Sequence, residues 1–328
     1  MKRREFITLL GGAAAAWPVA SWAQPERMRR IAWLSTNTEN DLLSQGHSAA
    51  FREGLAKLGW IEGRNLHIDF RWGDDFNRLG AHAAELVSLA PEVIVTSGGA
   101  ATRAVQPQTH AIPIVFTAAG DPVSDGLVRN IARPEGNITG FSSREPSIAA
   151  KFLELLKEAA PRLTRVAVIF NPELTSVASR YIASIEAAAL AFRAQVIKTP
   201  VRNAIDIVRA IDAFATKPNG GLLVLPPSPI TAIRDMILEL AAQYRLPAIY
   251  PNLADVTAGG LLAYATDRVD QFRRAATYVD RLLRGAKVDD LPVQFPTKYE
   301  LVINLKTAKA IGLDIPSFLL QRADEIIE

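Results

Sequence analysis

The chain has 328 residues, and its 37 lysines and arginines nearly balance its 34 aspartates and glutamates. That balance gives no sign of the strongly basic surface with which proteins bind nucleic acids or anionic membranes. The sequence contains no cysteine, which excludes disulfides, a thiol nucleophile and a lipoprotein anchor. A chain of this length can bury a large core and usually divides into two domains.

The amino terminus has the pattern of an export signal, to which we assign residues 1–23. Residues 2–4 are basic, residues 7–16 form a short apolar core, and residues 21–23 match a cleavage site. The apolar run is too short to span a bilayer. The paired arginines, followed by Phe6, are similar to a twin-arginine signal, and an ordinary secretory signal is the alternative. Either signal predicts a soluble protein of the periplasm without a lipid anchor.

The first half of the chain alternates apolar runs typical of buried strands with segments of helical spacing. We predict strands at Arg30–Leu34, Leu66–Arg71, Val93–Thr96 and Ile112–Phe116, and helices at Asp41–Leu58, Phe76–Leu89 and Ala100–Gln106. This β-α-β-α-β-α-β order predicts a doubly wound parallel sheet.

The stretch from Pro91 to Val123 carries one half of a predicted small-molecule cleft. Its two strands end in small polar residues, and ligands of open α/β sheets bind beyond the carboxyl ends of the strands. Gly98 lets the backbone approach a ligand, and the helix that follows offers free N–H groups. Asp121, beside that crevice, could meet a cationic group. The alternative is that the glycine loop is an ordinary connector.

A second βα layer follows Asn137–Ser143, a short polar segment in which we expect the chain to cross between lobes. Predicted strands lie at Arg165–Phe170, Gln195–Lys198, Gly221–Leu225 and Pro247–Tyr250, and predicted helices at Ile148–Ala160, Ser176–Arg193, Ile205–Ala215 and Ile230–Tyr244. We expect the strand Gly259–Ala265, and the helix that Asp267 caps, to return to the first lobe. Val293–Pro296 would cross again, and a strand at Glu300–Leu305, the segment Lys306–Gly312 and a helix from Phe318 would finish on the second lobe.

The predicted fold is therefore α/β, with two doubly wound βαβ (Rossmann-like) lobes joined by three segments. The first lobe comprises residues 24–142 plus 256–292, and the second comprises residues 143–255 plus 293–328. Two lobes connected in this way close around a ligand by a hinge motion.

The sequence offers no residue set for catalysis, metal binding or cofactor binding. It has no G-x-S-x-G elbow, no P-loop and no G-x-G-x-x-G after the first strand. The Asp74-Asp75 pair lies in a predicted turn, where a solvated loop is the simpler interpretation. The four histidines are scattered without the spacing of metal ligands: His47, His67, His82 and His110. We predict a binding protein rather than an enzyme, without a cofactor.

Several runs match one family in the family's own order. They are Ile112–Phe116 leading to Asp121–Val123, then Asn137–Gly140, Gly259–Tyr264 and the tail from Leu291 to Glu328. On these runs the chain resembles the ABC-transporter substrate-binding proteins related to tryptophan- and tyrosine-binding proteins, which have the type I periplasmic binding fold. The resemblance covers nearly all of the mature chain. It implies a cleft ligand, most directly an amino acid and in particular an aromatic one, that is delivered to an ABC permease of the inner membrane.

Strand-end positions supply the ligand-binding residues that this resemblance implies. The first lobe contributes Ser35, Thr36, Ser97, Gly98, Ala118 and Asp121, and the second contributes Asn171, Pro226, Ser228, Tyr250 and Asp255. Trp72 is a further candidate, to stack on an aromatic ligand, and the alternative is that it packs the hinge or the core edge. We expect a monomer that binds no nucleic acid.

Other functions suit the same architecture. The protein could pass ligand occupancy to a membrane receptor, or it could take up aromatic carboxylic acids. An enzyme of glycosyltransferase-like or sugar-phosphate class would need acid–base or metal groups at the strand ends, where only Asp121 and Asp255 are available.

Overall fold

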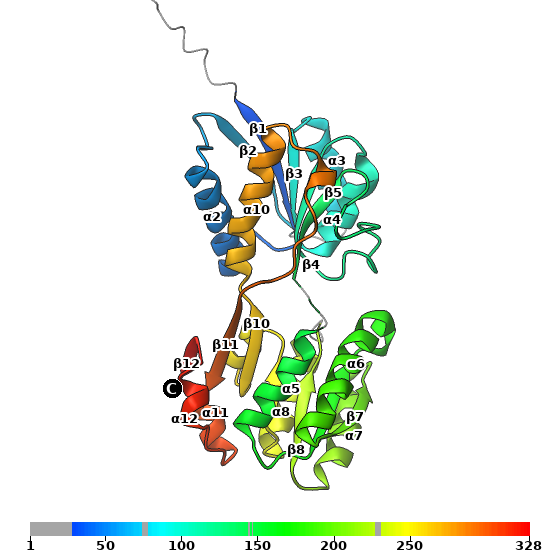
Figure 1. Cartoon of the computed structure of the whole chain (residues 1–328), viewed down its shortest axis with the longest axis vertical. Helices are drawn as coiled ribbons and strands as arrows, with labels where there is room; N and C mark the ends of the chain where they lie inside the picture. Colours follow the sequence, from blue (N-terminus) through cyan, green and yellow to red (C-terminus); the bar gives the residue numbers. More distant parts are fainter. Residues whose placement is uncertain (1–27, 74–77, 144, 146, 227–230) are drawn as a thin grey trace, which may run out of the picture.

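The computed structural model describes residues 28–73, 78–143, 145, 147–226 and 231–328. The predicted export signal, Asp74-Asp75 and Ser228 lie outside these residues. Within them, no helix is both long enough and apolar enough to cross a membrane. Figure 1 shows two α/β lobes, one above the other, connected by a few narrow segments.

The first lobe is built on a five-stranded parallel sheet with strand order β2-β1-β3-β4-β5. Its strands are β1 (Arg29–Ser35), β2 (Leu66–Arg71), β3 (Val93–Ser97), β4 (Ile114–Ala119) and β5 (Ile138–Ser142), and its helices are α2 (Leu42–Lys57), α3 (Leu79–Ser88), α4 (Gly99–Val105) and α10 (Arg268–Leu283).

The two faces of this sheet bury separate apolar clusters. On one face, α2 and α10 cover Ile31, Trp33 and Val95, and on the other face α3 and α4 cover Leu34 and Ile94. Because successive side chains of a strand point to opposite faces, strands that are apolar throughout require helices on both sides. The sequence prediction of a doubly wound layer is confirmed.

The second lobe is built on a seven-stranded sheet with strand order β12-β11-β10-β9-β8-β6-β7, in which only β10 and β11 run antiparallel. Its strands are β6 (Arg165–Phe170), β7 (Gln195–Pro200), β8 (Gly220–Val224), β9 (Ala248–Tyr250), β10 (Leu262–Thr266), β11 (Tyr299–Asn304) and β12 (Glu325–Ile327). Its helices are α5 (Ile148–Ala159), α6 (Thr175–Phe192), α7 (Ala204–Ala215), α8 (Thr231–Gln243), α9 (Leu253–Thr257), α11 (Leu305–Ala310) and α12 (Ser317–Leu320).

The polar segment at Asn137–Ser143, which we predicted to be the crossing itself, instead forms β5 at the edge of the first sheet. Thr139 is fully buried, and its Oγ1 donates to the Leu291 carbonyl oxygen at 2.5 Å. Gly140 has a φ of 151°, and a Cβ at this position would lie 2.1 Å from the Phe116 carbonyl oxygen. The glycine therefore marks a close backbone approach inside the sheet, and the crossing begins only after this strand.

The strand predicted at Gly259–Ala265 lies in the second sheet, which corrects its assignment to the first lobe. As β10 it pairs in parallel with β9 and antiparallel with β11. The chain returns to the first lobe only after Thr266, with α10, whose first N–H groups Asp267 caps as predicted. The apolar run alone could not reveal which sheet would take it.

Three segments join the lobes, and hydrogen bonds link them to one another. Thr266 Oγ1 donates to the Ser143 carbonyl oxygen at 3.2 Å, and the Asp267 N–H donates to the Lys298 carbonyl oxygen at 3.1 Å. The third segment leaves the first lobe at Gln294, whose N–H donates to the Gly140 carbonyl oxygen. Short strand connections of this kind absorb a rotation with few contacts to break.

Candidate functional site

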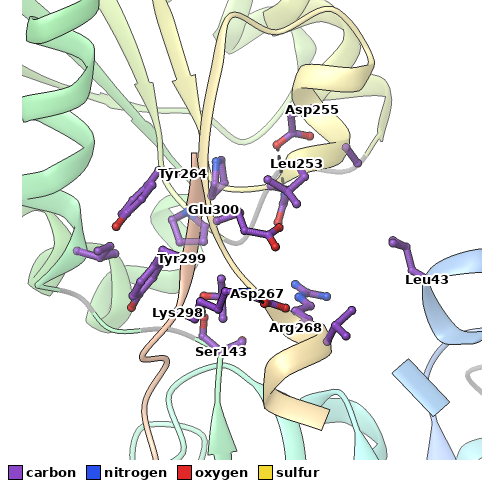
Figure 2. Close-up of a pocket in the computed structure, with 18 of the residues that line it drawn as sticks. Leu43, Ser143, Leu253, Asp255, Tyr264, Asp267, Arg268, Lys298, Tyr299 and Glu300 are labelled. Atoms are coloured by element: carbon purple, nitrogen blue, oxygen red, sulfur yellow. Dashed lines mark hydrogen bonds and ion pairs between the residues drawn. The ribbon is translucent and has the colours of Figure 1, made fainter. Parts of the chain in front are cut away.

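A cavity of about 1130 Å³ lies where the two lobes face each other. The first lobe lines it with the start of α2 and the start of α10, and the second lobe lines it with α9, the ends of β9 and β10, and the start of β11. Figure 2 shows Leu43 on one side of this space and Leu253, Asp255 and Glu300 on the other. A cavity of this size exceeds what an amino acid or a sugar needs, as expected of lobes that are open.

The part of the first-lobe wall that α2 forms begins with two leucines. Leu42 and Leu43 open α2, immediately after the N-cap Asp41, and both line the cavity. Their exposed fractions are 81% and 62%. These two leucines present apolar surface to the cavity, and a ligand or the opposite wall that covered it would remove that surface from water.

His47 continues this wall one turn later and is neutral at ordinary pH. Its ring stacks on Phe272 of α10, with centroids 4.4 Å apart and planes 22° apart. Burial and the nearby Arg268 guanidinium lower the pKa of His47 to about 4. The residue therefore adds no positive charge to the cavity above that pH.

One side of the cavity in the second lobe is aromatic. Tyr264 on β10 and Tyr299 on β11 stack at 5.2 Å, and Phe152 of α5 meets Tyr264 edge-on at 6.4 Å. Burial, together with the Glu145 carboxylate, raises the pKa of Tyr299. These rings are neutral, and they form the wall on the α5 face of the sheet.

The other side of the cavity is rich in charged groups. Lys298 Nζ lies 2.7 Å from Asp267 Oδ2, while Asp267 Oδ1 accepts the Asp270 N–H at the start of α10. Burial alone would raise the pKa of Asp267, but these hydrogen bonds outweigh it and hold the pKa below its usual value. Asp255 is 2% exposed, and its Oδ2 accepts from Asn252 Nδ2 at 3.3 Å.

Two of the residues predicted from strand ends line this cavity, Pro226 after β8 and Asp255 in α9. Both follow strands of the second lobe at the edge that faces the first lobe, which is the position the strand-end argument required. Ser228 lies outside the described residues.

The predicted residues at the ends of β1 and β3 lie together, but they do not line the cavity. Thr36 Oγ1 donates to the Ser97 carbonyl oxygen at 3.3 Å, and Ser35 Oγ accepts the Asn37 N–H at 3.0 Å. Gly98 has a φ of 96°, and a Cβ there would lie 2.6 Å from Thr36 Oγ1. The close approach of these two strand ends is therefore a sufficient reason for the glycine.

Asp121, the predicted cation partner, meets a cation of the protein itself. Its Oδ1 accepts the N–H groups of Val123 and Ser124, both at 3.1 Å, and its Oδ2 pairs with the guanidinium of Arg180 on α6. This pair bridges the two lobes, outside the residues that line the cavity. Ala118, at the end of β4, has a φ of 53° beside a register shift between β4 and β5.

The remaining candidates have local partners. Trp72 stacks on Phe70 at 5.6 Å with planes 9° apart, which matches the alternative of packing at the sheet edge. Asn171 Oδ1 accepts the Glu173 N–H at 2.9 Å. Tyr250 is 1% exposed in the core of the second lobe, where burial and the Asp255 carboxylate raise its pKa.

The residues that α2, α10 and β11 bring to the cavity were not predicted from the strand ends. Glu300 is the clearest case, because it is a charged residue in front of the apolar run Leu301–Ile303 of a strand. That contrast was a signal available in the sequence. Among the described residues, no group of three histidine, aspartate or glutamate side chains could hold a metal ion.

Comparison with known proteins matches residues 40–327 to a family model described as ABC transporter substrate binding protein. The chain belongs to this family. A tyrosine-binding protein from Clostridioides difficile strain R20291 is 27% identical over 265 residues, which is 80% of this chain and 75% of that protein. The family consists of solute-binding proteins that work with ABC permeases, which agrees with the prediction that the chain is not an enzyme.

Solved structures share the fold. A conserved domain protein from Vibrio cholerae is 25% identical with a TM-score of 0.75, and it covers 92% of this chain and 100% of its own. An ABC domain from Streptococcus pneumoniae in complex with L-tryptophan has a TM-score of 0.75 at 23% identity, with coverage of 92% and 100%. An open, ligand-free substrate-binding protein from Clostridium difficile has a TM-score of 0.78 at 21% identity, with coverage of 92% and 99%. The fold is therefore the type I periplasmic binding fold, as predicted.

Proposed function

We propose that this protein captures an amino acid in the cavity between its lobes and delivers it to an ABC permease of the inner membrane. The main support is the cavity itself, which elements of both lobes line, while the described chain passes between the lobes in narrow segments. The similarity to a tyrosine-binding protein supports an amino acid, and in particular an aromatic one, as the ligand.

Closure of the hinge provides the binding mechanism. Rotation of the lobes would bring Leu42 and Leu43 of α2 toward Leu253 of α9, so that apolar surface leaves water together with the ligand. Pockets of this kind enclose roughly 70–90% of a small ligand. The permease could then distinguish the closed, loaded protein from the open, empty one.

We further propose that the protein acts in the periplasm as a monomer and without a nucleic-acid partner. The basic start, short apolar core and cleavage pattern in residues 1–23 support export. The near balance of acidic and basic residues supports the absence of a nucleic-acid partner.

A thermal-shift screen of residues 24–328 tests this function. The protein is first unfolded and refolded to remove carried-over ligand, and the panel holds the twenty amino acids, aromatic acids, short peptides and common sugars. A ligand at a hundredfold excess over its Kd stabilises the fold by about 2.7 kcal/mol, which shifts Tm by several degrees.

A shift with L-tyrosine, L-tryptophan or L-phenylalanine and none with the matching desamino acids would support an amino-acid receptor. A shift with aromatic acids alone would replace that ligand class with aromatic carboxylic acids. No shift with any member would contradict the proposal. A neighbouring histidine-kinase gene in place of permease and ATPase genes would favour the sensory role.

A further inference from the structure

Four carboxylates of the second lobe and its hinge line the cavity. They differ in whether another residue already donates a hydrogen bond to them or pairs with their charge. Glu145 accepts from Ser147 Oγ at 2.7 Å, Asp255 accepts from Asn252, and Asp267 pairs with Lys298. The Glu300 carboxylate makes no hydrogen bond or ion pair with any residue that the structure describes. A carboxylate that lines a cavity and has no partner among the described residues is suited to bind a cationic group of a ligand.

The backbone of Glu300 fixes this side chain at the hinge. Glu300 lies in β11 opposite Ala265 of β10, directly after the segment that connects the lobes. Because successive side chains of a strand alternate, Tyr299 points to the aromatic side and Glu300 to the opposite side. Figure 2 shows the Glu300 side chain extending between Leu253 and Arg268, toward the lobe that carries Leu43.

The surroundings of Glu300 make its ionised form costly in the empty protein. Partial burial and the Asp267 carboxylate raise the pKa of Glu300. The other charged groups that act on it are Lys298, Asp324 and Glu325, and Arg268 lies on the cavity wall nearby. Lys298, the near cation, is committed to Asp267. A ligand cation would therefore gain a charge-assisted hydrogen bond that no side chain in the described part of the chain supplies.

We propose that Glu300 is the cation-binding group of the site and receives the ammonium group of the ligand. This inference rests on the proposed function, because it names the group that recognises one end of an amino acid in the same cavity. It assigns to the hinge strand the role for which the sequence suggested Asp121, whose carboxylate is paired with Arg180 away from the cavity. The Arg268 guanidinium lies on the same side of β11 and suits the ligand carboxylate.

The placement has a functional consequence. Glu300 lies on β11, at the hinge about which the lobes would rotate. A ligand that binds Glu300 would therefore couple occupancy of the site to closure of the lobes. Ligands without a cationic group would leave the Glu300 charge unpaired when the lobes close. The site would therefore reject them by the cost of burying that charge.

Calorimetric titration with three related probes tests the inference. L-tyrosine carries both charges, tyramine carries only the ammonium group, and 3-(4-hydroxyphenyl)propionate carries only the carboxylate. For Glu300→Gln we expect at least a tenfold weaker Kd for L-tyrosine and for tyramine, and tighter binding of the desamino acid, because the variant no longer buries an unpaired charge. Glu239→Gln, which removes an exposed carboxylate from α8 outside the cavity lining, is the matched control and should leave all three constants unchanged.

The outcomes separate this inference from the proposed function. If the wild-type protein binds L-tyrosine and Glu300→Gln binds it equally well, the role of Glu300 is overturned while the amino-acid receptor stands. A loss in Asp121→Asn instead would return that role to Asp121. If the wild-type protein binds the desamino acid alone, or no member of the amino-acid panel, the proposed ligand class and the Glu300 assignment are both overturned. Unchanged circular dichroism of Glu300→Gln shows that the variant is folded.

Discussion

The buried, uncharged state of His47 should make the stability of the protein fall as the pH decreases. Its pKa lies at about 4 in the folded protein, against 6.5 for an ordinary histidine. Because the unfolded chain binds this proton more tightly, the contribution of His47 is complete above the unfolded pKa and is lost between about pH 6.5 and pH 4. At about 1.4 kcal/mol per pKa unit, the loss amounts to about 3 kcal/mol.

Urea unfolding, followed by circular dichroism between pH 7.5 and pH 4, measures this effect. The perturbation is His47→Gln, which keeps a polar side chain of similar size but cannot be protonated in this range. We expect the variant to be less stable at pH 7.5, because the stack on Phe272 is lost, but to lose about 3 kcal/mol less than the wild type on acidification. His110→Gln, which replaces an exposed histidine outside the cavity lining, is the control for the substitution itself.

The reasoning is refuted if His47→Gln and the wild type lose the same free energy of unfolding over this range. That result would mean that the imidazole is protonated in the folded protein without penalty. The cavity wall from the first lobe would then gain a further positive charge at mildly acidic pH, which would disfavour cationic ligands.

Three further predictions concern stability and interlobe contact. Glu300→Gln should raise the thermal unfolding midpoint of the ligand-free protein at pH 7, because burial and the Asp267 charge penalise the ionised Glu300 carboxylate. An unchanged or lower midpoint would show that the protein already stabilises this charge. Two Gly→Ala substitutions in α2 should change the free energy of unfolding, measured by urea titration, in opposite directions. At exposed Gly46 a Cβ would meet nothing within 4 Å, so Gly46→Ala should raise stability by about 0.5–1 kcal/mol. At Gly54 a Cβ would lie 2.8 Å from Ala276 Cβ of α10, so Gly54→Ala should lower stability by about 1–3 kcal/mol. If both substitutions changed stability in the same direction, the packing of α2 against α10 described above would be contradicted. A double-mutant cycle of Asp121→Asn and Arg180→Gln should give a coupling energy below about 1 kcal/mol, because the Arg180 guanidinium is half exposed. A larger coupling energy would mean that this ion pair holds the two lobes in one relative orientation.

The sequence predicted the interior of each lobe well because buried strands and amphipathic helices depend on local patterns. Leu66–Arg71 and Arg165–Phe170 agree with β2 and β6 at both ends. Errors lay where tertiary contacts decide. The polar segment Ile138–Ser142 is a strand because Gly140 and Thr139 fit against β4 and the chain before Pro292. The last strand, β12, has only three residues and depends on its pairing with β11.

The location of the cavity was predictable from the sequence, but most of the residues that line it were not. The strand-end argument identified the edge of the second lobe at which Pro226 and Asp255 line the cavity. It could not identify the partner of Asp121, since Arg180 is distant in the sequence and lies on the other lobe. It also did not place β10 in the second sheet, where β10 pairs with β11, the strand that brings Glu300 to the cavity. Residue patterns encode faces of elements, whereas the order in which the chain crosses between lobes is a property of the whole fold.

The most direct test of a ligand site between the lobes compares two exposed leucines. The measurement is a calorimetric titration of refolded residues 24–328 with L-tyrosine, for the wild type, for Leu43→Glu on the cavity wall and for Leu190→Glu. Leu190 is 85% exposed on α6 and lies outside the cavity lining, so it controls for the loss of an exposed leucine. We predict one ligand per chain for the wild type and for Leu190→Glu, and at least tenfold weaker binding for Leu43→Glu. Equal binding by all three proteins, or no binding by the wild type, would contradict the account.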